Sequence, residues 1–144
     1  MTVLANEKNS KKPPVVIEAP NKVLVVDEMP ARLDALYKSG VLQTKATYAK
    51  NGLVAIDWIV DNGPWDVIFL DHDLDTWVHD PYPREVTGRD VAQIITRQSW
   101  QPHLVVIHSM NSSGASNIEN TLRSAGIKCM QIPIYQIGGL FCWG

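Results

Sequence analysis

The chain has 144 residues, a formal net charge of −2 and a pI of about 6.0. This length fits one domain that can bury a core of its own. The charge excludes the basic field that holds duplex DNA, but it leaves a nucleotide or an RNA end as a substrate. The chain has no apolar run of membrane-spanning length, and its polar N-terminus does not resemble a signal peptide. We therefore expect a cytoplasmic protein without a membrane partner.

Apolar patterns and turn signals predict alternating strands and helices after a flexible N-terminal arm at residues 1–21. Pro30 can begin the first helix and Gly40 can end it, while Asn62-Gly63 ends the second. The expected order is strand 22–28, helix 31–40, strand 44–50, helix 51–63, strand 65–71, helix 88–99, strand 103–109, helix 115–126 and strand 127–135.

This alternation predicts an α/β fold for residues 22–144, with a doubly wound, five-stranded parallel sheet between two layers of helices. The last helix is expected to be reduced or missing, because the chain ends in "QIGGLFCWG". The segment 74–86 is expected to form a long loop that acts as a mobile lid over the site, since it is longer than a strand-to-helix link requires.

Polar residues follow three of the predicted strands directly. Asp27-Glu28 ends the first, Asp71-His72-Asp73 follows the apolar run 67–70, and His108-Ser109 follows the run 104–107. The working crevice of an open parallel sheet lies outside the carboxyl ends of its strands. One such residue is usually a helix cap or a turn former, but three clusters at one edge favour a functional site.

These clusters resemble those of receiver domains of response regulators. Asp27-Glu28 matches the metal-binding acidic pair of that superfamily, Asp71 its phospho-accepting aspartate, and Ser109 lies near its switch Ser/Thr. Receivers carry a lysine before the proline after the fifth strand, where this chain has Ile132-Pro133. A phosphorylation switch is therefore not expected.

A narrower resemblance rests on "LDHDL", "TGRDVA" and "IHSMNSSGASNIENTLRSAG", which occur in this order. They are similar to blocks of the cyclic-phosphate-processing receiver-like domains, over about residues 22 to 135. The resemblance implies an enzyme that handles a cyclic phosphate or nucleotide. The first block departs from the family's pattern, because Glu28 replaces an aspartate and the arginine is displaced to Arg32.

Opening a cyclic phosphodiester requires an acid, a base and groups that bind phosphate oxygens. His108 and His72 are the candidate acid and base, oriented by Asp71 or Asp73. Strict strand alternation would instead turn His72 to the opposite face, under a helix. The candidate substrate-binding residues lie in three segments: Ser109, Asn111 and Gly114 near a helix N-terminus, Thr87 in the "TGRDVA" block, and Arg84 in the long loop beside Trp77 and Tyr82.

Asp27, Glu28 and Asp71 form a set of oxygen ligands suited to Mg²⁺ or Mn²⁺. Adding His72 or His108 to this set would favour Mn²⁺ or Zn²⁺. The alternative to an enzyme is a receiver-like module that acts by binding a partner protein. An imidazole at position 108 favours the enzyme, because a docking module does not need one there.

Overall fold

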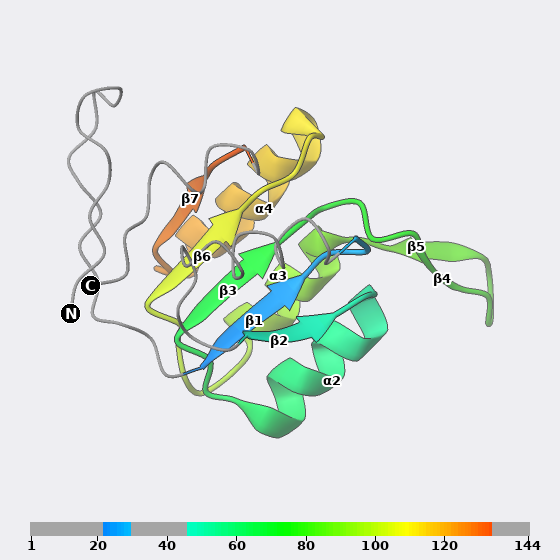
Figure 1. Ribbon diagram of the computed structural model, residues 1–144. Helices are drawn as coiled ribbons and strands as arrows, with labels where there is room; N and C mark the ends of the chain where they lie inside the picture. The colour runs from blue at the N-terminus through cyan, green and yellow to red at the C-terminus, as the bar shows by residue number, and fades with distance from the viewer. Residues whose placement is uncertain (1–21, 30–45, 134–144) are drawn as a thin grey trace.

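The computed structural model describes residues 22–29 and 46–133. Five strands form one parallel sheet in the order β2-β1-β3-β6-β7 (Figure 1). Their bounds are β1 Val23–Val26, β2 Ala46–Ala49, β3 Val67–Leu70, β6 Leu104–Ile107 and β7 Cys129–Gln131. The arrangement confirms the predicted five-stranded parallel α/β sheet of the receiver and flavodoxin-like type.

Within the described residues, three helices follow strands of this sheet: α2 Gly52–Asn62, α3 Gly88–Thr96 and α4 Ser112–Ser124. α3 packs between α2 and α4, so the three lie on one face (Figure 1). Alternate residues of the central strands pack against them, because side chains along a strand point to opposite faces in turn. These residues are Leu24, Val26, Ile68, Leu70, Val105 and Ile107.

The residues between them on the same strands are also buried: Val23, Val25, Val67, Phe69, Leu104 and Val106. The central strands are therefore buried on both faces, as their continuous apolar runs indicate. The predicted arm at 1–21, the predicted helix at 31–40 and the expected loss of the last helix lie outside the described residues. No described helix is long and apolar enough to cross a membrane.

The predicted loop at 74–86 is instead largely a β-hairpin, which corrects the sequence-based expectation. Strands β4 (Thr76–Val78) and β5 (Arg84–Val86) pair antiparallel and extend beyond the sheet (Figure 1). The base of the hairpin is fixed to the body: Val86 is buried, and the Thr76 hydroxyl accepts a hydrogen bond from the Gly52 backbone N–H at 3.0 Å. Closure of this segment over the site remains a prediction.

Two helix ends also differ from the expectation. α4 begins at Ser112 rather than residue 115, because the Asn111 side chain accepts a hydrogen bond from the Gly114 N–H and caps the helix. α3 ends at Thr96 rather than residue 99. The "SSGAS" segment is therefore part of the first turns of α4 and not a loop in front of it.

Candidate functional site

Strand register brings Asp27, Asp71 and His108 together. Val26 pairs with Leu70 and Leu70 pairs with Ile107, so the next residue of each strand lies in one row across β1, β3 and β6. The backbone hydrogen bonds continue into this row, with the Asp71 N–H donating to Val26 and the His108 N–H to Leu70. The three side chains continue the face of Val25, Phe69 and Val106, which is opposite the described helices.

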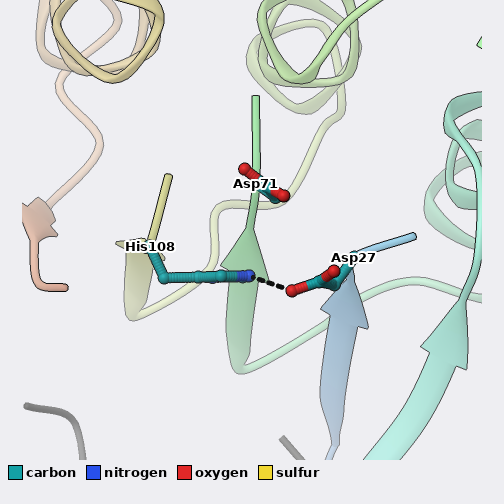
Figure 2. Close-up of side chains that lie close together, drawn as sticks. All are labelled: Asp27, Asp71 and His108. Atoms are coloured by element: carbon teal, nitrogen blue, oxygen red, sulfur yellow. Dashed lines mark hydrogen bonds and ion pairs between the residues drawn. The ribbon is translucent and has the colours of Figure 1, made fainter. Parts of the chain in front are cut away.

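Asp27, Asp71 and His108 form one compact buried group (Figure 2). His108 Nε2 hydrogen-bonds Asp27 Oδ2 at 3.0 Å, and both of these side chains are fully buried. Nδ1 of His108 is also buried and has no hydrogen-bond partner in the described structure. One nitrogen or carboxylate oxygen from each residue lies within 4.8 Å of the others. Several ionisable side chains are normally buried this close together only when they neutralise one another or hold a cation.

Burial raises the pKa of the Asp71 carboxyl above its ordinary value, and the nearby Asp27 carboxylate adds to the rise. The His108 imidazole opposes both effects, as do hydrogen bonds from the Ser109 hydroxyl and the Asp73 backbone N–H. Ionisation of the Asp71 carboxyl is therefore less favourable than that of an exposed aspartate.

The donor set of this group suits a divalent cation. Two carboxylates and one imidazole are ligands that Mn²⁺ or Zn²⁺ accepts, and the carboxylates alone suit Mg²⁺. Glu28, which the sequence placed in the metal set, is exposed and lies outside the group, whereas His108 lies inside it. Strand alternation explains the difference, because consecutive residues point to opposite faces.

A second polar group contains His72, Asp73 and Asn111. His72 Nδ1 lies 2.8 Å from Asp73 Oδ1, and the Asn111 amide donates to the same oxygen at 3.3 Å. The hydrogen bond with His72 lowers the pKa of Asp73 below its ordinary value. Because a carboxylate only accepts hydrogen bonds, this contact places a hydrogen on Nδ1 and leaves the Nε2 lone pair of a neutral ring available.

Packing fixes the position of His72 on the helical face of the sheet. A Cβ atom on Gly114 would lie 2.3 Å from the His72 ring, so only glycine lets α4 approach this closely. The structure thus agrees with the alternative that turns His72 away from Asp71 and under a helix. The His72 side chain still keeps 15% of its surface exposed.

Ser109 and Asn111 connect the two groups. The Ser109 hydroxyl hydrogen-bonds Asp71 and also accepts from the Asn111 backbone N–H at 3.0 Å. Asn111 in turn contacts Asp73 and caps α4. The structure therefore arranges most of the sequence-predicted site residues as two adjoining groups at one edge of the sheet.

Thr87 and Arg84 take part in a different arrangement, at the start of α3. The Thr87 side chain and that of Asp90 form a reciprocal capping box, and Arg84 forms an ion pair with Asp90 at 3.3 Å. A Cβ atom on Gly88 would lie 2.2 Å from the Asp71 backbone oxygen, so the start of this helix lies directly against the site. The structure gives Thr87 and Arg84 a structural role beside the site, and substrate binding by them remains a prediction.

Residues 22–124 match the family model of the cyclic-phosphate processing receiver domain. The chain belongs to this family. The match covers most of the chain and includes both polar groups. At the position where receivers carry their lysine, the family member described here has Ile132, which is buried, and its backbone N–H donates to the Ile107 carbonyl.

Solved structures of receiver domains share this fold. The receiver domain of a Francisella response regulator, 1452, is 23% identical over 81% of this chain and 89% of its own, with a TM-score of 0.55. The response regulator domain of Thermotoga maritima CheB is 23% identical over 82% and 87%, also with a TM-score of 0.55. An adenylate cyclase structure from Rhodopirellula baltica is 17% identical over 81% and 78%, with a TM-score of 0.57. No curated protein matches the chain.

Proposed function

We propose that this protein is a phosphoesterase that hydrolyses a cyclic phosphate of a nucleotide or an RNA end. The observation that carries the proposal is the buried group of Asp27, Asp71 and His108, whose ligand atoms lie within 4.8 Å of one another. Membership of the cyclic-phosphate processing family supports the choice of substrate.

Asp27, Asp71 and His108 would hold a divalent cation such as Mn²⁺ or Mg²⁺. A bound cation would supply positive charge for the phosphate oxygens and lower the pKa of a coordinated water. The fully buried side chain of His108 has no exposed surface from which to reach a substrate. We therefore assign His108 to holding the cation, rather than to the direct acid–base role that its position in the sequence suggested.

We assign proton transfer to His72. Its Nδ1 is held by Asp73 and 15% of its side-chain surface is exposed, so Nε2 would be the atom that takes a proton from the attacking water. The water oxygen forms a bond to phosphorus, one phosphorus–ribose oxygen bond breaks, and the proton passes to that ribose oxygen. Asp73 fixes the tautomer and stabilises the imidazolium, as carboxylates do in other catalytic dyads.

The second candidate is a receiver-like module that binds a partner protein without catalysis. The buried Ile132 favours it over a phosphorylation switch, because the counter-charge used in receivers is replaced by an apolar side chain. The same observation does not distinguish this module from the enzyme.

Hydrolysis assays followed by ³¹P NMR separate the two candidates. Purified protein is incubated with 2′,3′-cyclic nucleotides, cyclic oligonucleotides and oligoribonucleotides ending in a cyclic phosphate, with Mg²⁺, Mn²⁺ or EDTA. We expect a cyclic phosphodiester to become a monoester in the presence of a cation. Asp71→Asn should lower turnover on the order of 10²-fold or more.

Asp57→Asn is the matched control, because Asp57 is an exposed aspartate of α2 outside both polar groups. Its turnover should equal that of the unmodified protein. Absence of hydrolysis for every substrate and cation, in protein with an intact thermal transition, would favour the docking module.

A further inference from the structure

The β4–β5 hairpin carries two exposed side chains that form no hydrogen bond or ion pair with a described residue. Trp77 and Glu85 pair directly across the two strands, so they project from the same face. Trp77 is 50% exposed, and neither side chain forms a hydrogen bond or ion pair within the described part of the chain. A half-exposed indole beside a carboxylate can offer a ligand both a stacking surface and a hydrogen-bond acceptor.

The two faces of the hairpin have different surroundings, and the face without Trp77 and Glu85 packs against the body of the protein. Thr76 and Val86, the neighbouring pair, face α2 and are buried, with Thr76 bonded to the Gly52 N–H and Val86 packed against that residue. One face therefore anchors the ribbon to the body. The face with Trp77 and Glu85 points away from that anchor.

The edges of the ribbon offer little for strand addition. Each strand has only three residues. Pro81 and Pro83 in the connection between them have no N–H to donate, and prolines are a common means of blocking sheet edges. Recognition by this hairpin must therefore use its side chains.

We propose that Trp77 and Glu85 form a platform that binds the base of the nucleotide substrate and prefers guanine. The indole stacks on the base, and the carboxylate accepts hydrogen bonds from the N1–H and the 2-amino group of guanine. Uracil offers a single N–H donor between two carbonyl oxygens. The carboxylate would repel these oxygens, so uracil should bind less tightly than guanine. This inference rests on the proposed function, because it assigns the base of the substrate processed at that site.

The platform lies within reach of the site. The hairpin begins three residues after Asp73, and an extended chain places Trp77 at most about 14 Å from it. We infer that the phosphate end of a nucleotide lies at the Asp27–Asp71–His108 group and that the nucleotide extends past Asp73, with its base, or the next base of a strand, on Trp77. Glu85 carries the wrong charge for a phosphate contact, which favours a base at this position.

Binding of guanosine and uridine 2′,3′-cyclic monophosphates, and of the dinucleotides GpG and UpU ending in a cyclic phosphate, tests the proposal. Titration calorimetry on the full chain should give at least about fivefold tighter binding of the guanine ligands. Trp77→Ala should weaken guanine binding by at least about fivefold, and Glu85→Gln should remove most of the preference over uracil. A preference confined to dinucleotides would place the base next to the terminal one on the platform.

Asp80→Asn and Tyr82→Ala are matched controls, because they remove an acid and an aromatic from the same hairpin outside the Trp77–Glu85 pair. Equal affinities for guanine and uracil ligands, or unchanged guanine binding in Trp77→Ala, would overturn the proposal. So would a dimer that dissociates in Trp77→Ala, since the platform would then bind a second copy. A guanine preference without turnover would support the platform and reject the phosphoesterase. Turnover without a base preference would support the phosphoesterase and reject the platform.

Discussion

Replacing Asp71 by asparagine should stabilise the cation-free protein. The Asp27 and Asp71 carboxyls lie in a buried group within 4.8 Å, and two unit charges at that separation repel by about 3.5 kcal/mol at an effective dielectric constant of about 20. The attraction between Asp71 and His108 is larger than this repulsion, but the cost of burying the Asp71 carboxylate, which asparagine avoids, is larger than either. We therefore expect the free energy of unfolding to rise by about 1–2 kcal/mol, which is the usual size of a single stabilising substitution.

Thermal unfolding in EDTA, across a pH series, measures this gain. At neutral pH the melting temperature of Asp71→Asn should rise by about 2–8 °C. Because the pKa of Asp71 is raised in the folded state, its ionisation costs stability as the pH rises from 3.8 through the folded pKa. Below 3.8 the carboxyl is protonated in both states, so the difference between variant and unmodified protein should shrink there.

The control for this series is Asp57→Asn, which should change the free energy of unfolding by no more than about 0.5 kcal/mol. A lower melting temperature for Asp71→Asn at neutral pH would refute the reasoning. It would mean that the Asp71 carboxylate is a net stabilising partner of its neighbours and needs no cation.

Three further substitutions test the residues around the site. Gly114→Ala should displace the His72 ring, lowering the free energy of unfolding by about 1–3 kcal/mol in a denaturant titration and reducing turnover as well. Thr87→Ala removes the hydroxyl of the α3 capping box and should cost about 1 kcal/mol in the same titration. Asp73→Asn should lower kcat on the order of 10²-fold or more if His72 transfers the proton, and unchanged kcat would remove that role. The lowered pKa of Asp73 gives stability that is present above 3.8 and lost as the pH falls through the folded pKa, so Asp73→Asn should flatten the acid limb of the melting curve against pH.

The sequence was sufficient to predict the sheet, because continuous apolar runs such as Val67–Leu70 are typical of strands buried on both faces. It also predicted that Asp27, Asp71 and His108 meet at one edge, since each ends such a run. That the three residues lie in one row across the strands could not be predicted, because one sequence does not show a shift of one residue in the pairing of two strands.

Other features depended on tertiary contacts that the sequence does not display. The β4–β5 hairpin was missed because its strands are short and its connection contains two prolines, so the segment looks like a loop. The metal set was predicted as Asp27, Glu28 and Asp71, with His72 or His108 as an addition, although strand alternation already separates Asp27 from Glu28. The contact between His72 and Gly114 depends on how closely α4 approaches β3, which follows from packing alone.

Titration of the metal-free protein with Mn²⁺, followed by electron paramagnetic resonance, tests most directly whether Asp27, Asp71 and His108 form a cation site. We predict one bound ion per chain, with affinity lowered at least about tenfold in Asp71→Asn and His108→Asn and unchanged in Asp57→Asn. Thermal unfolding of each variant confirms that it is folded. Absence of Mn²⁺ binding, or binding that neither site substitution weakens, would contradict the account.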